Sequence, residues 1–307
     1  MRQRVLIVGS VALDDIITPG GGGRDLLGGS AVYGAVAAAN FAPVDIVGVA
    51  GEDFADQHVA TLRSRGINLE GLECVPGGAT FHWAGEYQAD TNEAITHRTE
   101  LGVFAEFNPR LPESYRDDAF VFLANIDPEL QLRVLEQVRR PVLTLCDSMN
   151  LWINIKRDAL LEVLRRVDVA LLNEGEARLL FETNSLPVAA ERLLELGVKR
   201  AIIKQGSHGA QMFSAEGTFA APAIPLRRVV DPTGAGDTFA GGLIGYLAAQ
   251  DELDELTFRK AVLVGTACAS FVVEDFSIGR TRELARHDIL ARCMQLYDTL
   301  RCDPVEF

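Results

Sequence analysis

The residues best suited to chemistry lie in one stretch near the C-terminal end, Asp231 to Gly242, which reads Asp-Pro-Thr-Gly-Ala-Gly-Asp-Thr-Phe-Ala-Gly-Gly. Gly234 and Gly236 lack a Cβ atom, so backbone N–H groups can converge there on an anion. The apolar run that follows predicts a buried helix, whose N-terminus favours negative charge. Asp237 falls in the first turn of this helix. It is either a general base beside an anion cradle or a carboxylate that only stabilises a helix end.

The longer string, Asp231 to Phe239, resembles the C-terminal signature of the ribokinase-like (PfkB) carbohydrate kinases. The resemblance implies that Asp237 takes the proton from a substrate hydroxyl. It implies that the transferring phosphoryl group is held by an anion hole of three residues, Gly234, Ala235 and Gly236. It further implies ATP as the donor and Mg²⁺ as the cofactor, and it leaves a monovalent-cation requirement open.

Two stretches near the N-terminus are candidates for binding the acceptor. Asp14 follows a short apolar run, Arg4 to Ser10, that predicts a buried strand. An ionised carboxylate can orient a polyol by accepting hydrogen bonds from its hydroxyls. A Gly-Gly pair then opens a long run of small residues, which predicts a helix packed closely on a sheet. Both stretches resemble the family's N-terminal pattern, which implies four acceptor-binding residues: Asp14, Gly28, Gly29 and Ser30.

One position departs from that pattern. The family usually carries Asn where this chain has Tyr33. Loss of the amide changes the expected contacts to the acceptor and suggests a subfamily with altered specificity. The expected acceptor is a sugar, and a nucleoside is the alternative. A non-catalytic nucleotide- or sugar-binding protein on the same fold is a third reading, which the intact Gly-Ala-Gly-Asp sequence disfavours.

The nucleotide and the metal are expected beside two later segments. Asn173 and Glu176 follow a predicted strand and match an Asn-x-x-Glu motif that in the family tunes magnesium and phosphate binding. A carboxylate there can hold Mg²⁺ through water, although it also suits a helix N-terminus. The predicted strand Arg200 to Lys204 leads into a glycine turn. The resemblance implies five nucleotide-binding residues: Asn173, Glu176, Lys204, Gly206 and Gly209.

Residues 79–102 differ in composition from the rest of the chain, since they are rich in Thr, His, Trp and Tyr. Ala79 to Gln88 and Glu93 to Leu101 alternate in part and predict a β-hairpin that turns at Ala89 to Asn92. With part of residues 13–25, the hairpin is expected to form a small β-lid over the substrate, which excludes water and, by resemblance, can mediate a homodimer. Its aromatic and histidine side chains either face a sugar or base or pack across strands: His82, Trp83, Tyr87 and His97.

A run of four glycines between Pro19 and Arg24 predicts a mobile loop or hinge. It is not a phosphate-binding loop of the G-x-x-x-x-G-K-[ST] type, which is absent from the sequence. A Rossmann dehydrogenase is disfavoured, because no G-x-G-x-x-G follows the first predicted strand. The apolar segment that ends Arg228-Val-Val is expected to be a strand leading into Asp231.

Strands and helices alternate over most of the chain, which predicts an α/β fold with a doubly wound, mainly parallel sheet flanked by helices. The resemblance covers nearly the whole chain, and residues 1–307 are expected to form a single ribokinase-like domain.

The composition of the chain limits the classes of molecule that it is expected to bind. The formal net charge of −14 disfavours nucleic acid and anionic membranes, so the expected partner is a small molecule. No apolar run approaches the ~20 residues of a membrane span. Five cysteines without metal-binding spacing fit reduced thiols and a cytoplasmic location.

Overall fold

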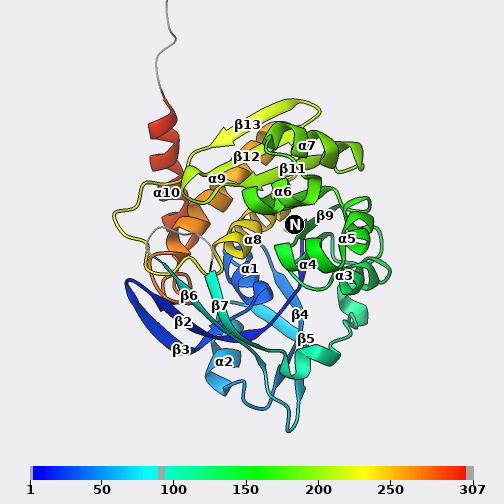
Figure 1. Ribbon diagram of the computed structural model, residues 1–307, viewed down its shortest axis with the longest axis vertical. Coiled ribbons are helices and arrows are strands. Elements are labelled where there is room, and N and C mark those ends of the chain that lie inside the picture. The colour runs from blue at the N-terminus through cyan, green and yellow to red at the C-terminus, as the bar shows by residue number, and fades with distance from the viewer. Residues whose placement is uncertain (1–2, 89–93, 302–307) are drawn as a thin grey trace, which may run out of the picture.

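The computed structural model describes residues 3–88 and 94–301. Its larger sheet has nine strands: β1 (Val5–Val8), β4 (Val44–Gly51), β5 (Ile67–Val75), β8 (Phe120–Leu123), β9 (Leu143–Asp147), β10 (Val169–Asn173), β11 (Arg200–Lys204), β12 (Ala210–Ser214) and β13 (Gly217–Ala221). Their order is β13-β12-β11-β10-β9-β8-β1-β4-β5 (Figure 1). The strands from β5 to β11 pair in parallel, and β12 and β13 add an antiparallel edge. The predicted mainly parallel sheet is confirmed.

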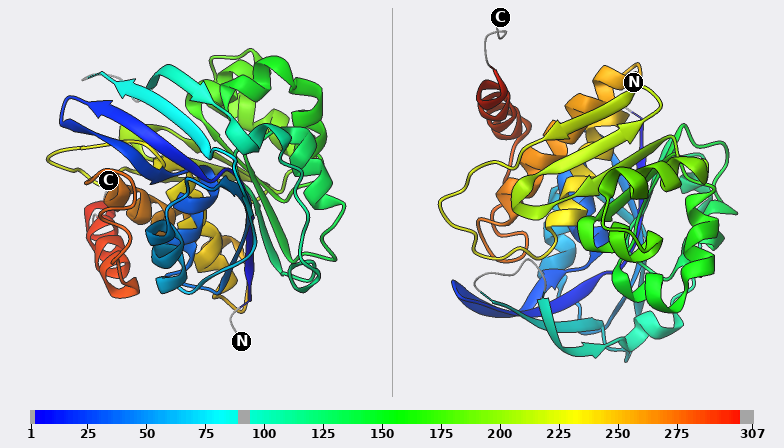
Figure 2. Two further views of the ribbon diagram at one scale, coloured as in Figure 1. Left: turned by 90° about the horizontal axis from the view of Figure 1, so that it is seen from below. Right: turned by 45° about the horizontal axis from the view of Figure 1, so that its top comes forward.

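Helices cover both faces of this sheet (Figures 1 and 2). One layer contains α1 (Ser30–Ala38), α2 (Asp56–Ser64), α8 (Ala235–Ala248) and α9 (Glu255–Val272), with α10 (Arg286–Leu300) packed outside α9. The other contains α3 (Pro128–Leu135), α4 (Asn150–Ile155), α5 (Arg157–Leu164), α6 (Glu174–Phe181) and α7 (Leu186–Glu195). Short 3₁₀ turns are η1 (Gly102–Glu106), η2 (Glu113–Tyr115) and η3 (Gly206–His208). None of the helices in the described part of the chain has the length and apolar character needed to cross a bilayer.

Strand β1 shows why its sequence is apolar throughout. Val5 and Ile7 pack into the core under α1, α8 and α9, while Leu6 and Val8 pack into the core under α3 to α7. Successive side chains of a strand point to opposite faces, so a strand covered on both faces needs an unbroken apolar run.

The direction of winding changes beside β1. The chain passes from β1 to β4 and β5 on one side, then returns to place β8 on the other side of β1 and continues to β11. In open α/β sheets, ligands bind at such a switch, outside the carboxyl ends of the strands. The edge that ends with Asp147 of β9, Asn173 of β10 and Lys204 of β11 is therefore where a site is expected.

A second sheet of four strands is built from β2 (Ala12–Thr18), β3 (Gly21–Gly28), β6 (Phe81–Tyr87) and β7 (Ala94–Glu100), in the order β3-β2-β6-β7. It lies apart from the larger sheet (Figure 2). Strands β6 and β7 pair antiparallel, as the predicted hairpin requires. The turn expected at Ala89 to Asn92 lies outside the described residues.

Two local predictions were wrong. The glycine run is not a loop, because Gly21, Gly22 and Gly23 pair with β2 as part of β3. Pairing with an existing strand outweighs the weak strand preference of glycine. The segment before Asp231 is not a strand, and its Val229 is 54% exposed. Its neighbour Arg228 instead donates a hydrogen bond to the Gly20 carbonyl, which ties the segment to the small sheet.

Candidate active site

The predicted anion hole forms the N-terminus of α8. Gly234 is the N-cap residue and has φ +73°, a conformation that favours glycine. A Cβ atom at this position would also lie 2.4 Å from the ring of Tyr33.

The first N–H groups of a helix have no partner within the helix, so they can receive an anion. Here the Ala235 N–H donates to the Pro232 carbonyl at 3.2 Å, which leaves the N–H groups of Gly234 and Gly236 without a partner among the described residues. Asp237 is the third residue of α8, in the turn where the sequence placed it.

Asp237 is half-buried, and its pKa is raised to about 7. Burial is the main cause, and the charge of Asp147 adds to it, while Lys204 acts in the opposite direction. The N-terminus of a helix favours a negative charge, so a carboxyl group that only stabilises this end would have a lowered pKa. This one instead has a pKa near neutral pH, where a general base is most effective.

Lys204 and Asp147 form a buried ion pair at the carboxyl edge of the sheet, with Nζ 2.5 Å from Oδ2. Burial lowers the pKa of Lys204, but the charges of Asp147 and Glu176 outweigh it, so the pKa is raised. A Cβ on Gly236 would lie 3.0 Å from Nζ, so the ammonium group lies beside the predicted anion hole. Lys204 was predicted and Asp147 was missed, although both end parallel strands at the same edge.

Asp14 lies on β2, inside the small sheet, and is only 4% exposed. A Cβ on Gly28 of β3 would lie 1.9 Å from its Oδ2, so only glycine leaves room for this carboxylate. Within residues 3–88 and 94–301, no hydrogen-bond donor contacts its oxygens. Burial, followed by the charges of Asp231 and Asp237, raises the pKa of Asp14 to about 8.

Asp231 is a further buried carboxylate that the sequence did not single out. Its oxygens accept hydrogen bonds from the backbone N–H of Thr233 (2.9 Å) and of Ser277 (3.4 Å). Its position fixes the turn that leads into α8, and its charge acts on Asp14. Asp231 is the first residue of the sequence motif, which was the only signal for it. In this protein each of its carboxylate oxygens accepts a hydrogen bond from the backbone.

Gly29 and Ser30 fix the start of α1. Gly29 has φ +100°, and a Cβ there would lie 2.4 Å from the Ser10 carbonyl oxygen. The Ser30 and Ser10 hydroxyls each accept a hydrogen bond from the other residue's backbone N–H, at 3.1 and 3.0 Å. The Ser30 hydroxyl also donates to the Asn125 carbonyl (3.3 Å). Both the side chain and the backbone N–H of Ser30 are therefore already engaged within the protein, and its predicted contact with the acceptor stays a prediction.

Asn173 and Glu176 form a capping box at the N-terminus of α6. Glu176 accepts from the backbone N–H of Asn173 at 2.7 Å and from its side-chain amide at 2.6 Å. Burial raises the pKa of Glu176 to about 8, against the lowering effect of Lys204. Each carboxylate oxygen keeps a second lone pair, so Glu176 fits a magnesium ion held through water.

The glycine turn after β11 is held by close packing. Gly206 begins η3 with φ +55°, and Gly209 ends it with φ +96°. A Cβ on Gly209 would lie 2.0 Å from the Ala221 carbonyl oxygen of β13. Both glycines are therefore needed for the backbone path, and their predicted contact with a nucleotide stays a prediction.

The two faces of the small sheet differ in what they carry. Trp83 pairs in register with Asp14, and Tyr87 of the same strand accepts a hydrogen bond from the Thr233 hydroxyl (3.3 Å). His82 instead lies 3.5 Å from Asp15, and His97 lies 3.0 Å from the Glu86 carboxylate on the exposed side. Neighbouring residues of a strand face opposite ways. Trp83 and Tyr87 therefore share the face of Asp14, and His82 faces away from it.

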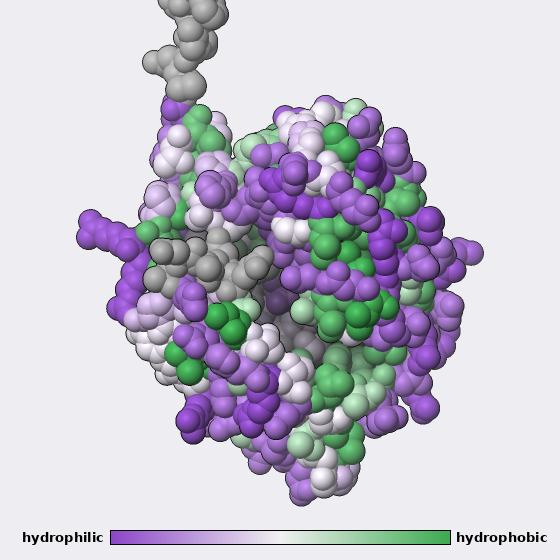
Figure 3. All heavy atoms as spheres, viewed as in Figure 1, coloured by the Kyte–Doolittle hydropathy of each residue, from purple (hydrophilic) through white to green (hydrophobic). Residues whose placement is uncertain are grey.

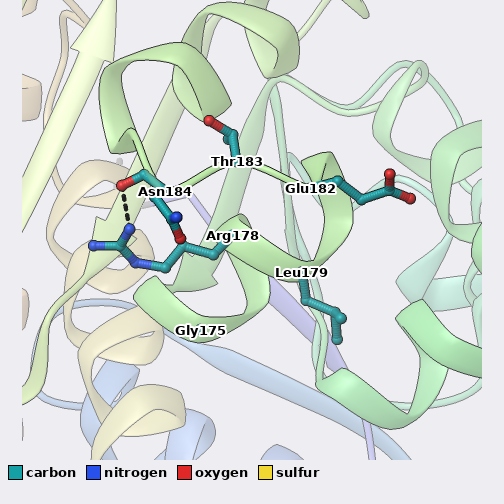
Figure 4. Close-up of a pocket in the computed structure, with 6 residues that line it drawn as sticks. All are labelled: Gly175, Arg178, Leu179, Glu182, Thr183 and Asn184. Carbon is teal, nitrogen blue, oxygen red and sulfur yellow. Dashed lines mark hydrogen bonds between the residues drawn. The ribbon is translucent and has the colours of Figure 1, made fainter.

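Figure 3 shows a hollow near the middle of the face seen in Figure 1, between the small sheet and the helices of the larger body. A separate surface pocket of about 450 Å³ lies against α6 and the turn after it (Figure 4). Its lining residues are Gly175, Arg178, Leu179, Glu182, Thr183 and Asn184. It contains none of the predicted site residues, and Arg178 turns toward the Asn184 carbonyl inside it.

Comparison with known proteins identifies the family of this chain. The model of the pfkB family of carbohydrate kinases matches residues 19–283. The chain belongs to this family. Over 251 residues, it is 32% identical to the cytidine kinase of Thermococcus kodakarensis, which covers 79% of this chain and 88% of the relative. It is a carbohydrate or nucleoside kinase.

Solved structures show the same ribokinase-like fold. The nucleoside kinase of Methanocaldococcus jannaschii superposes with a TM-score of 0.77 at 23% identity, over 95% of this kinase and 98% of the other chain. A candidate ribokinase II from E. coli, in complex with ATP and Mg²⁺, superposes with the same TM-score at 21% identity, over 95% and 99% of the two chains. At these identities the likeness concerns the fold.

Proposed function

We propose that this kinase transfers the γ-phosphoryl group of ATP to a hydroxyl of a sugar ring, and that the ring belongs to a nucleoside. The main support for the proposal is the position and pKa of Asp237. This residue lies in the first turn of α8, close to Lys204, and its pKa is about 7. Asp237 takes the proton of the acceptor hydroxyl. The acceptor oxygen bonds to the γ-phosphorus, the bond from that phosphorus to the β,γ-bridging oxygen breaks, and ADP leaves.

The α8 N-terminus and Lys204 stabilise the charge on the phosphoryl group during transfer. Phosphoryl transfer depends mainly on positioning and on electrostatic stabilisation of the equatorial oxygens. The predicted anion hole is Gly234, Ala235 and Gly236. The N–H groups of Gly234 and Gly236 supply partial positive charge without a side chain in the way, whereas the Ala235 N–H already donates to the Pro232 carbonyl at 3.2 Å. Bound Mg²⁺ neutralises phosphate charge, and Glu176 with Asn173 is the group in this chain that would hold its water ligands.

Asp14 orients the acceptor. Its carboxyl group is buried with no donor among the described residues, so its oxygens can accept hydrogen bonds from the hydroxyls of a ligand. Gly28 keeps the space that this carboxylate needs. The four-stranded sheet that carries Asp14 acts as a lid and excludes water from the transfer.

Trp83 favours a nucleoside over a free sugar. A Cβ on Gly85 would lie 2.2 Å from the Trp83 indole, so the ring packs closely against this glycine. The indole Nε1 donates to the Thr96 hydroxyl at 3.2 Å, which fixes the ring on the face of Asp14. A fixed aromatic platform next to a hydroxyl-binding carboxylate suits a ligand with a planar base and a sugar. The 32% identity to a cytidine kinase supports the same class.

ADP release tests the proposal with Mg·ATP and a panel of nucleosides (cytidine, adenosine, inosine), ribose and sugar phosphates. We expect turnover with a nucleoside, and a loss of about 10²–10⁴-fold in kcat for Asp237→Asn. The matched control is Asp254→Asn, the same change at the N-cap of α9. Faster turnover with ribose than with any nucleoside would show that the acceptor is a free sugar and not a nucleoside. Full turnover by the Asp237→Asn protein would refute the assigned base.

Three earlier expectations extend the proposal and are tested separately. A homodimer through the lid predicts a mass near twice 33.3 kDa by sedimentation. A monovalent-cation requirement predicts higher turnover in potassium than in a large organic cation. A cytoplasmic location predicts activity that is unchanged by thiol reductants.

A further inference from the structure

The outer face of the small sheet carries a cluster of three side chains that the proposed mechanism does not use. Asp15 lies on β2, Asp25 on β3 and His82 on β6. One oxygen of each carboxylate and one ring nitrogen of the histidine lie within 4.8 Å of one another. Among the residues that the structure describes, this is the one group of three or more His, Cys, Asp or Glu side chains placed closely enough to share an ion.

The register of the strands places the three side chains on one face. His82 pairs with Leu13, and Asp15 follows two residues after Leu13, so all three share a face. A β-bulge lies next to them, where Asp15 is opposite both Arg24 and Asp25 of β3. Asp25 has φ +50°, and its N–H donates to Asp15 Oδ1 at 3.0 Å. Bulges change the direction of a side chain, and this one brings the Asp25 carboxylate to the face of His82.

His82 lies between the two carboxylates at distances that suit a shared ion. Its Nε2 is 3.5 Å from Asp15 Oδ1 and 3.4 Å from Asp25 Oδ1. Both values exceed the usual length of an N–H···O hydrogen bond, about 2.7–3.2 Å. Ligands that are each about 2.0–2.2 Å from a tetrahedral zinc ion are about 3.3–3.5 Å from one another, which is the spacing found in this cluster.

The other histidine of the lid has a different arrangement. His97 Nε2 lies 3.0 Å from Glu86 Oε2, at hydrogen-bond distance, and within the described parts of the chain no second carboxylate shares this contact. The His97 side chain is also half exposed, whereas that of His82 is 13% exposed. A packed imidazole between two carboxylates is therefore specific to the position of His82.

The cluster is open to solvent on the side of Asp25, whose side chain is 75% exposed, so an ion can enter there. An imidazole and two carboxylates are ligands that zinc accepts, and a fourth position is left for water. Mg²⁺ prefers an octahedron of oxygen ligands, which an imidazole does not supply. The cluster thus differs in chemistry from the magnesium site proposed at Glu176.

The guanidinium group of Arg98 contacts the same histidine. Its Nη2 lies 3.2 Å from His82 Nδ1 and 3.4 Å from Asp15 Oδ2. Arginine has no acceptor, so Nδ1 accepts this hydrogen bond and the ring proton is on Nε2. A metal ion on Nε2 requires this proton on Nδ1, and Arg98 must then turn away. Its side chain is half exposed and can do so, which makes Arg98 a competitor of the ion.

We propose that Asp15, Asp25 and His82 form a binding site for a divalent first-row metal ion, with zinc as the best-fitting occupant. The ligand atoms are Asp15 Oδ1, Asp25 Oδ1 and His82 Nε2. The site lies on the face of the sheet opposite Asp14, so the ion takes no part in phosphoryl transfer. It joins β2, β3 and β6 at one point and fixes the lid strands to one another. This site does not depend on the proposed function.

Titration of the full chain with zinc chloride tests the site. The protein is treated with a chelator, dialysed and titrated in a calorimeter without nucleotide or acceptor. We expect one zinc ion whose binding depends on His82, so His82→Gln should weaken it by at least about 100-fold, since loss of an outer-shell partner already costs about 10- to 100-fold. His97→Gln is the matched control and should bind zinc as the wild type does. Absence of zinc binding by the wild type, or equal affinity of the wild type and His82→Gln, would overturn the inference.

Two further variants distinguish an ion site from an ion-pair network around Arg98. Asp25→Asn alters an exposed side chain, so its melting temperature without metal should be that of the wild type. Zinc should raise the melting temperature of the wild type, because it binds the folded state, and leave that of Asp25→Asn unchanged. Arg98→Gln should bind zinc at least as tightly as the wild type. A loss in Arg98→Gln as large as that in His82→Gln, or an equal zinc effect on Asp25→Asn and the wild type, would overturn the inference.

Discussion

The Lys204 ammonium group joins the end of the parallel sheet to the start of α8. It lies 2.5 Å from the Asp147 carboxylate, and a methyl group on Gly236 would lie 3.0 Å from the same nitrogen. One side chain therefore neutralises a buried carboxylate and lies beside the proposed anion hole. Because both roles depend on one charge, a substitution at this position affects stability and catalysis together.

Replacement of Lys204 by methionine is expected to lower the free energy of unfolding by about 3–5 kcal/mol, because it leaves Asp147 buried and unpaired. Urea denaturation measures this change. Lys199→Met is the matched control, since Lys199 also pairs with an aspartate, Asp168 at 2.7 Å, but its side chain is 69% exposed. An exposed pair contributes about 0–1 kcal/mol.

A double variant separates the two roles of Lys204. Adding Asp147→Asn to Lys204→Met removes the unpaired charge, so we expect part of the lost stability to return. The kcat of the double variant should stay low, because the charge beside Gly236 is still absent. Recovery of kcat together with stability would mean that Lys204 serves the fold alone.

Gly28 is expected to be essential for binding the acceptor. In Gly28→Ala the new methyl group would lie 1.9 Å from Asp14 Oδ2, so the carboxylate must move. We predict a rise in the KM of the acceptor of at least about tenfold, since one displaced hydrogen bond to a charged group costs about 1.5–3 kcal/mol. The KM for ATP should be nearly unchanged, because the nucleotide does not contact Asp14 in the proposed mechanism.

Gly20→Ala controls for a methyl group added beside the small sheet, in the turn between β2 and β3. The nearest atom to a Cβ at Gly20 is the end of the flexible Arg228 side chain, at 3.1 Å. This variant should keep the KM values of the wild type. Equal effects of the two substitutions would assign the loss to the sheet as a whole and not to Asp14.

The sequence predicted the parts of the site that depend on local chemistry. The turn before α8 needs a glycine at Gly234 and places Asp237 by helix geometry, so a local motif suffices. Asp147 was missed because its role depends on Lys204, 57 residues away, and only the sheet brings the two together. The glycines of β3 were misread for the same reason, since their pairing with β2 is a tertiary contact.

The burial of the Tyr33 hydroxyl was also beyond prediction. The sequence marked the position as a departure from the family, but burial and the absence of a partner among the described residues are properties of packing. A local pattern identifies the residue type at a site. It does not indicate which of its polar atoms the fold leaves unsatisfied.

The pH dependence of turnover should follow Asp237. Because its pKa is about 7, kcat/KM is expected to rise between pH 6 and pH 8 as the carboxyl group loses its proton. Lys204 lowers this pKa, so the Lys204→Met variant should show the same rise at higher pH. A rise that stays in place in this variant would belong to another group, such as ATP itself.

Asp14 should make the ligand-free protein less stable as the pH rises. An aspartate carboxyl group in the unfolded chain has a pKa of about 3.9, whereas the pKa of Asp14 in the folded protein is about 8. Between these values the folded state binds more protons than the unfolded state, so stability falls with rising pH across this window, and the loss is complete above about pH 8. Asn has the same shape and no charge to bury. Asp14→Asn should therefore melt at a higher temperature than the wild type at pH 8, by at least about 2 °C, and at nearly the same temperature at pH 4.

The acceptor and a matched substitution complete this test. Asp14→Asn should lose binding of the nucleoside while it gains stability, since the carboxylate that burial disfavours is the group that receives the hydroxyls. Asp254→Asn should gain no stability at pH 8, because the Thr257 N–H and hydroxyl lower the pKa of Asp254 and favour its charged form. A wild type that melts at the same temperature as Asp14→Asn at pH 8 would show that Asp14 is paired before the acceptor arrives.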